Sequence, residues 1–219
     1  MASREVLTEL AATYGRSTAQ PVSAEAAGGV DVAKRVAADE PVDVVVLSST
    51  AIDKLIAEGK LLAGSRVDLM SCGIAVAVRA GAPQPDVSSE QALKLAVLAA
   101  PSLSYSTGPS GVHLEKTFER WGILEQIRSR IVVPPPGVPV GSLIASGAAA
   151  LGFQQLSELK DLPGIEVVGP LPPPVQTITI FSGGVSRSCT RPEAARALLA
   201  FLASDAASGA KRRFGMEPA

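Results

Sequence analysis

Two long apolar segments, one near the middle of the chain and one near its end, most constrain the fold. The first, residues 67–78, reads VDLMSCGIAVAV, and the second, residues 177–182, alternates isoleucine with threonine. A β-strand advances about 3.3 Å per residue, so a strand as long as the first can pass out of one compact lobe and into another. Turns rich in proline flank both segments. The sequence therefore predicts two lobes that are joined by two crossing strands.

Around these two segments, helical and strand patterns alternate along the chain. Residues 43–47 (DVVVL) form a continuous apolar run, which is typical of a strand buried on both faces. The order in the first third indicates an α/β fold with a mainly parallel sheet. Periodicity and turn residues predict helices over 3–14, 30–38, 51–58, 89–98, 111–121, 139–146, 155–160, 192–203 and 205–213. They predict strands over 20–23, 43–47, 67–78, 103–106, 131–133, 150–154, 177–182 and 186–190.

The crossing strands set the expected domain boundaries. We expect lobe one to comprise residues 1–73 and 178–219, and lobe two to comprise residues 74–177. Mixed sheets flanked by helices would form each lobe, with a ligand cleft between the two lobes.

Composition and missing motifs exclude several classes of function. The 219 residues include 20 basic and 21 acidic side chains, so there is no bulk positive field for nucleic acid. No run of about 18 apolar residues predicts a membrane span. One histidine and two distant cysteines, Cys72 and Cys189, make a metal site implausible, and their spacing leaves a disulfide undecided. Phosphate-loop, dinucleotide and Ser–His–Asp patterns are missing, so no cofactor is expected.

Several segments together resemble the bacterial extracellular solute-binding proteins related to the periplasmic molybdate-binding protein. The matching segments are DVAKRVAADEPVDVVVLSSTAIDKLIAEGKLL, IAVAVRAGAPQPDVSS, YSTGPSGVHLEKTFERWGI, GAAALGFQQLSEL and PEAARALLAFLASDAA with GMEPA. The resemblance covers nearly the whole chain. It implies a type 2 periplasmic-binding fold, a small anionic ligand, an ABC-type transporter permease as partner, and a periplasmic location.

The sequence departs from that family in three places. The family opens with a strand and a serine-rich turn, whereas Met1-Ala2-Ser3 begins inside that turn with no signal peptide before it. We therefore expect either a preceding export signal and strand or a cytoplasmic protein. Hydroxyl residues of the first-lobe turn are replaced by Gly28-Gly29-Val30, and a second-lobe tyrosine is matched by Gln155. The last two changes favour an organic acid over a tetrahedral oxyanion.

The strongest candidate site lies where a strand ending at Tyr105 meets the run TGPSG at residues 107–111. A helix that begins here presents backbone N–H groups and a positive dipole end, which suit a carboxylate or oxyanion. Lobe one has the same arrangement of a buried strand followed by hydroxyl residues at a helix start, at Ser48, Ser49 and Thr50. Helix capping accounts for only one of these three hydroxyls. The predicted ligand-binding residues are Ser3, Gly29, Ser48, Ser49, Tyr105, Ser106, Thr107, Ser110, Gly111, Val138, Gln154 and Gln155.

Two functions from different classes fit these features. The first is a solute-binding protein that delivers an organic acid or oxyanion to a transporter. The second is an isomerase, because aconitate isomerase is similar to molybdate-type binding proteins and moving a double bond needs one base and an anion-binding site. His113, the only imidazole in the chain, is the candidate base under the second reading.

Overall fold

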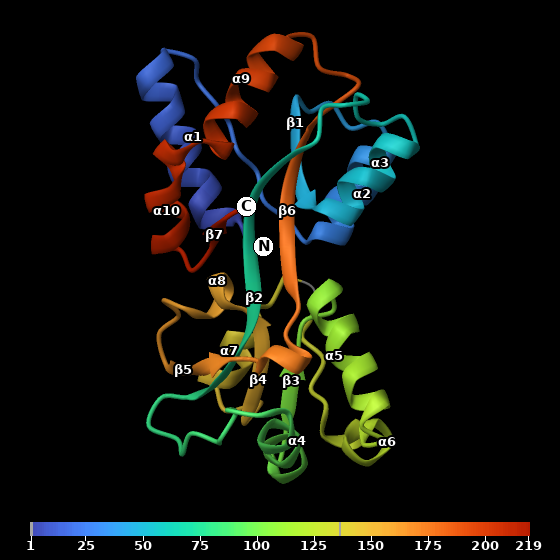
Figure 1. Cartoon of the computed structure of the whole chain (residues 1–219), viewed down its shortest axis with the longest axis vertical. Coiled ribbons are helices and arrows are strands. Elements are labelled where there is room, and N and C mark those ends of the chain that lie inside the picture. The colour runs from blue at the N-terminus through green and yellow to red at the C-terminus, as the bar shows by residue number, and fades with distance from the viewer. Residues whose placement is uncertain (1, 136) are drawn as a thin grey trace. The chain divides into compact units, whose positions relative to one another are not determined.

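The computed structural model describes residues 2–135 and 137–219, and its contacts group the chain into two compact units (Figure 1). The first unit comprises Met1–Cys72 and Thr179–Ala219, and the second comprises Gly73–Ile178. Strands β2 and β6 each contain one of these two boundaries. No helix among the described residues is both long enough and apolar enough to cross a membrane.

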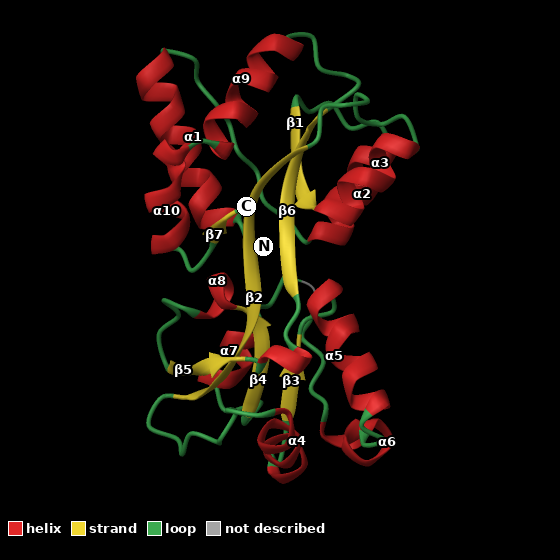
Figure 2. Ribbon diagram, in the orientation of Figure 1, coloured by secondary structure: helices red, strands yellow, loops and turns green. Residues whose placement is uncertain are grey.

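The first unit combines a small sheet with helices from both ends of the chain (Figure 2). Its helices are α1 (Arg4–Thr18), α2 (Gly29–Ala37), α3 (Ser49–Ala57), α9 (Pro192–Ala203) and α10 (Ser208–Arg213), with a 3-10 turn at Asp205–Ala207. Its strands are β1 (Val44–Ser48), the start of β2 (Val67–Arg79), most of β6 (Ile178–Val185) and β7 (Glu217–Pro218). β1 pairs with β6, and β7 pairs with β2, both antiparallel.

Apolar side chains on β1 hold helices α2 and α3 in place. Burial alternates along β1, where Val45 and Leu47 are buried and join Val36 of α2 and Ile52 of α3 in one cluster. Elsewhere in the first unit, α1 packs against α9 and α10. The ring centroids of Tyr14 and Phe201 lie 5.3 Å apart. The N-terminal helix is thus held by the C-terminal helices.

The second unit is built on a four-stranded sheet in the order β3-β4-β2-β5. Its strands are β3 (Leu103–Tyr105), β4 (Leu151–Gln155), the end of β2 and β5 (Ile165–Pro170). Its helices are α4 (Glu90–Ala99), α5 (Pro109–Arg120), α6 (Leu124–Ile127), α7 (Val140–Ala145) and α8 (Leu156–Leu159), with 3-10 turns at Arg128–Arg130 and Pro173–Val175.

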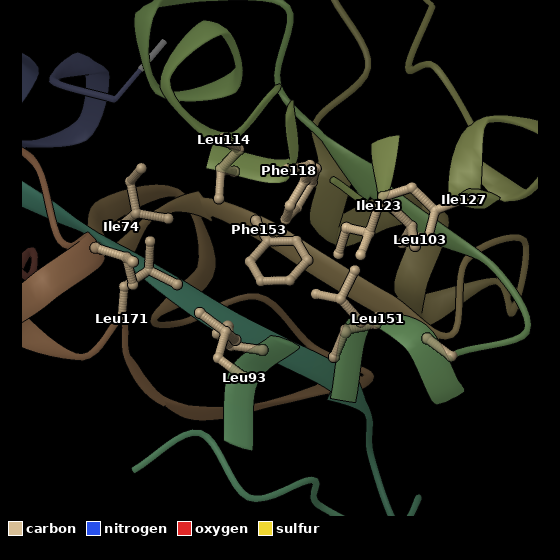
Figure 3. Packing of buried hydrophobic residues seen from close by; sticks show 14 of the residues in the cluster. Ile74, Leu93, Leu103, Leu114, Phe118, Ile123, Ile127, Leu151, Phe153 and Leu171 are labelled. Atoms are coloured by element: carbon tan, nitrogen blue, oxygen red, sulfur yellow. The ribbon is translucent and has the colours of Figure 1, made fainter. Parts of the chain in front are cut away.

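An aromatic and aliphatic core covers one face of this second sheet. Phe153 of β4 is fully buried at its centre, surrounded by side chains from α4, α5 and α6 (Figure 3). Phe118 of α5 makes an edge-to-face contact with Phe153, with ring centroids 6.2 Å apart. The opposite face packs on α7 through Val140 and Ile144, and Gly152 lets α7 approach closely, because a Cβ there would lie 2.1 Å from Ile144.

Most predicted helices and strands are present, and three expectations are wrong. Residues 20–23 form no strand, residues 131–133 contribute only a single bridge from Ile131 to Leu103, and residues 186–190 contribute only a bridge from Ser186 to Leu61 before the chain turns. The sheet is not mainly parallel either, since β3–β4 is the single parallel pair among the strand pairs described. The reason is that β2 and β6 pair antiparallel with neighbouring strands. An alternation of helices and strands in the sequence does not show the direction of these two strands.

One buried charge in the first unit yields a test of stability. Lys211 of α10 is fully buried, and its Nζ has no hydrogen-bond partner within residues 2–135 and 137–219. Burial lowers the pKa of this ammonium, and Asp205 partly opposes that change. The folded state therefore holds the proton more weakly than the unfolded state does.

We expect Lys211→Met to raise the free energy of unfolding at pH 7 by about 1–4 kcal/mol, because an apolar side chain removes the cost of the buried charge. At pH values between the lowered pKa of the folded state and the ordinary value of 10.5, the Lys211 amine binds more protons in the unfolded state than in the folded state. The free energy of unfolding of the wild type therefore rises with pH in this range. The advantage of the variant should shrink accordingly as the pH approaches that value. Urea unfolding at several pH values measures this, with the exposed Lys54→Met as control; a wild type more stable than Lys211→Met at pH 7 would contradict it.

Candidate functional site

The parallel pairing of β3 and β4 brings two strand ends together in the second unit (Figure 1). Tyr105, the last residue of β3, is in register with Phe153, so Ser106 and Gln154 follow at neighbouring positions. Paired strands lie about 5 Å apart, and one small ligand can reach the loops that follow both of them. We call residues 105–111 and 154–158 the β3–β4 edge.

Two serines form the polar centre of the β3–β4 edge. The Oγ atoms of Ser106 and Ser110 lie 2.8 Å apart, and Ser110 is only 5% exposed. Ser110 does not cap its helix, since Gly108 occupies the N-cap position of α5. Ser89 shows the contrast, because its Oγ accepts a hydrogen bond from the amide of Ala92 and caps α4 in the usual way. The Ser106–Ser110 pair is therefore available for a role other than capping.

Gly111 is required by the close approach of the chain to itself. A Cβ at this position would lie 1.5 Å from the carbonyl oxygen of Ser106, which no side chain can occupy. Its amide donates to the carbonyl of Gly108 at 3.0 Å, so this N–H is engaged inside the turn. The structure thus explains Gly111 by sterics, and its predicted contact with a ligand stays a prediction.

The two glutamines at the end of β4 lie on opposite faces of the sheet. Gln155 is opposite Ile74, which belongs to the core beneath α5, whereas Gln154 is opposite Ala75 on the face of α7. Both side chains are almost fully buried, at 4% exposure for Gln154 and 5% for Gln155. The sequence predicted a pair of amides acting together, and the alternation of side chains along a strand separates them.

Gln154 instead has a partner on α8 that the sequence reading missed. Its side chain is hydrogen-bonded to the half-buried carboxyl of Glu158, so its amide nitrogen is the donor. Burial raises the pKa of Glu158, and the bond from Gln154 partly offsets this. The Oε1 atom of Gln154 is buried without a hydrogen-bond partner in the described part of the chain. Leaving a buried oxygen without a hydrogen bond costs stability, so a bound ligand that donates a hydrogen bond to this atom would be stabilised here.

Tyr105, Thr107 and Val138 occupy less central positions. The ring of Tyr105 packs edge-on against Phe118, with centroids 5.9 Å apart, and burial raises the pKa of its hydroxyl. Thr107 is exposed in the loop before α5. Val138 is 37% exposed and its amide donates to the carbonyl of Pro135. These three remain predicted ligand contacts.

His113 lies along the side of α5 and contacts backbone. Its Nε2 donates to the carbonyl oxygen of Val175 at 2.9 Å, because a carbonyl can only accept. The same side chain lines a shallow hollow of about 240 Å³ together with Lys116, Thr117, Arg120 and the turn at Pro174 and Val175. The hollow follows α5 toward its C-terminal end. His113 therefore holds α5 against the segment at residues 173–175, which gives it a packing role.

In the first unit, Gly29 and Ser48 begin two helices that pack on β1. Ser48 is the N-cap of α3 but makes no capping bond, and its Oγ lies 3.3 Å from that of Thr50. Ser49 is the first residue of the same helix. A Cβ on Gly29 would lie 3.7 Å from Leu47, so the start of α2 is close to the end of β1.

Ser3 starts a different helix of the first unit, α1, which packs on α9 and α10. It is the N-cap residue and makes no side-chain capping bond. The structure thus distributes the predicted ligand residues over both units, four in the first and eight in the second. The cleft expected between the lobes stays a prediction.

Cys72 and Cys189 are not joined in a disulfide. The thiol of Cys72 donates to the carbonyl of Gly215 over 3.4 Å, and burial raises the pKa of Cys189. Residues 2–135 and 137–219 contain no group of three or more His, Cys, Asp or Glu side chains placed to hold a metal ion.

Comparisons with known proteins agree on family and fold. Residues 1–217 match the family model of bacterial extracellular solute-binding proteins. Aconitate isomerase from Pseudomonas sp. is 41% identical over 220 residues, covering 97% of this chain and 83% of that protein. The periplasmic molybdate-binding protein of Azotobacter vinelandii superposes with a TM-score of 0.81 at 20% identity, covering 98% of this chain and 95% of that one.

A second solved structure supports the same fold. The substrate-binding domain of a molybdenum ABC transporter from Clostridium difficile gives a TM-score of 0.75 at 15% identity, with 100% of this chain and 95% of that chain covered. The chain therefore has the type 2 periplasmic-binding-protein fold that its sequence resemblance implied.

Replacing Gly111 with alanine should disrupt the β3–β4 edge. The added Cβ would overlap the Ser106 carbonyl, so the turn must move, and overpacking of this kind costs about 1–3 kcal/mol. Gly108→Ala is the matched control, because the nearest atom to a Cβ there is 3.8 Å away and an alanine N-cap costs only about 1 kcal/mol. Urea unfolding compares the two variants. Equal losses of stability would show that the close approach at Gly111 is not a constraint.

Proposed function

Because the chain belongs to the family of bacterial extracellular solute-binding proteins, we propose that it binds a small organic polycarboxylate and isomerises it by moving a carbon–carbon double bond. The observation that carries this proposal is the 41% identity with an aconitate isomerase over 97% of the chain. Identity spread over both units makes a shared activity a better explanation than a shared fold alone.

The β3–β4 edge has the chemistry that a carboxylate requires. Ser106 and Ser110 bring two hydroxyl groups to the start of α5, where the helix dipole favours a negative charge. Gln155 adds a buried amide on the same face of the sheet. Hydroxyl and amide donors pair well with carboxylates, and they are held in place before any ligand arrives.

The isomerisation requires few catalytic groups from the protein. Moving a double bond by one position in a tricarboxylate removes a proton from one carbon and returns a proton to another. One group that accepts and then donates a proton is sufficient, together with donors that stabilise the negative charge as it spreads onto a carboxylate. No cofactor takes part in such a proton shift.

A second candidate function is delivery of an organic acid to an ABC-type transporter in the periplasm. The family match itself favours it, because solute binding is what the family description states. Binding alone would give a stable complex with unchanged ligand, whereas an isomerase would turn the ligand over. The two functions are thus separated by one measurement of turnover.

We expect the purified protein to interconvert cis- and trans-aconitate, followed by ultraviolet absorbance because the two isomers absorb differently. Thermal shift with tricarballylate, the saturated analogue, measures binding without turnover. A ligand at 100 times its Kd should add about 2.7 kcal/mol of stability. Stabilisation without any interconversion would favour the transport function, and neither response would contradict both.

Ser110→Ala should weaken tricarballylate binding by about 10- to 150-fold, since one hydrogen bond to a charged group contributes about 1.5–3 kcal/mol. The stability of the free protein should fall less, by about 1 kcal/mol, because only the neutral hydrogen bond with Ser106 is lost. Calorimetric titration beside a melting curve measures both effects. Ser146→Ala, which removes an exposed hydroxyl bonded to Leu143, is the matched control. Unchanged affinity with lowered stability would remove Ser110 from the site.

A further inference from the structure

We propose that Glu158 is the group that takes and returns the proton during isomerisation, an inference that rests on the proposed function. Glu158 was not among the residues that the sequence pointed to. Its case rests on its position, on its bond to Gln154 and on the lack of another suitable base at the β3–β4 edge.

The position of Glu158 follows from the short connection after β4. Helix α8 begins at Leu156, directly after Gln155, and Glu158 lies within this single turn. The side chain is half-buried and is hydrogen-bonded to Gln154, which fixes its direction. Gln154 is 4% exposed, and its remaining oxygen has no partner in the described part of the chain. A carboxyl held beside an unsatisfied amide oxygen indicates a polar ligand at this point.

Two other titratable groups, Tyr105 in the edge and His113 near it, are less suitable bases. Tyr105 has a pKa raised by burial, so its hydroxyl stays protonated at neutral pH. His113 donates to the Val175 carbonyl and lines the hollow along α5. Among the side chains of the β3–β4 edge, this leaves the carboxyl of Glu158.

The surroundings of α8 favour a proton-accepting carboxyl. α8 packs against β4, which has no titratable side chain, and against β5, whose Glu166 already accepts bonds from Gly81 and Gln84. Lys160, just after α8, is exposed. Burial is the largest influence on Glu158, and it raises the pKa of this carboxyl toward the range in which a carboxylate is an effective base.

The proposed step conserves atoms and electrons. The ionised Glu158 takes a proton from the methylene carbon of the substrate, and the electrons of that C–H bond form a new double bond to the central carbon. The electrons of the original double bond move toward the far carbon, with charge held on the adjoining carboxylate. Glu158, now protonated, returns the proton to that far carbon, so the protein ends unchanged and no oxidant or reductant is consumed.

The test compares Glu158→Gln with wild type in three measurements: turnover of trans-aconitate, calorimetric binding of tricarballylate, and deuterium incorporation into the substrate in D₂O. We expect kcat to fall by about 10²- to 10⁴-fold, the usual contribution of a general base. Tricarballylate affinity should stay within about threefold and deuterium incorporation should be lost. Glu119→Gln, an exposed glutamate on α5, is the matched control and should retain full turnover.

Two further readouts separate proton transfer from a structural role. Glu158→Asp keeps the carboxyl and should recover part of the lost turnover. The wild-type profile of kcat/KM should fall as acid protonates the base, and any activity left in Glu158→Gln should lack this decline. A melting curve of each variant establishes that it is folded.

The outcomes also distinguish this inference from the proposed function. An inactive wild type overturns the isomerase function and this inference with it. If the wild type and Glu158→Gln are both active, only the role of Glu158 is overturned. The same holds if His113→Gln loses turnover while Glu158→Gln keeps it. Loss of tricarballylate binding in a folded Glu158→Gln would make the residue a ligand contact and would also overturn the proposal.

Discussion

The parallel register of β3 and β4 is the constraint on which the candidate site depends. Because Tyr105 and Phe153 are in register, the loops after both strands begin at the same edge of the sheet. The approach of Gly111 to the carbonyl of Ser106 then fixes the start of α5, and the burial of Phe153 fixes the end of β4. Backbone pairing and packing therefore determine where the polar groups lie before any ligand binds.

Much of the fold could be predicted because its signals are local. The helix at 192–203 begins with a proline at its first turn, and the structure has it at Pro192–Ala203. The apolar run at 67–78 became the strand Val67–Arg79, since its length and its β-branched residues leave few alternatives. The start of α5 could also be predicted from its Gly-Pro-Ser-Gly sequence, because turn residues have specific backbone requirements.

The rest depends on contacts between distant residues. β5 (Ile165–Pro170) pairs with β2 and carries no clear alternation of buried and exposed residues, so its sequence did not single it out. The separation of Gln154 from Gln155 depends on which face of β4 meets the core. Glu158 was missed because a glutamate in a helix turn is ordinarily solvated, and only its bond to Gln154 distinguishes it.

The central claim, that the β3–β4 edge binds the carboxylates of the substrate, is tested most directly by amide hydrogen exchange with and without saturating tricarballylate. The account predicts that protection increases in two peptides of the second unit, one covering residues 105–112 and one covering residues 154–160. Slower exchange there reflects donors engaged by the ligand and helix ends held in place. Protection confined to residues 113–120 and 173–176, around the hollow beside α5, would contradict it.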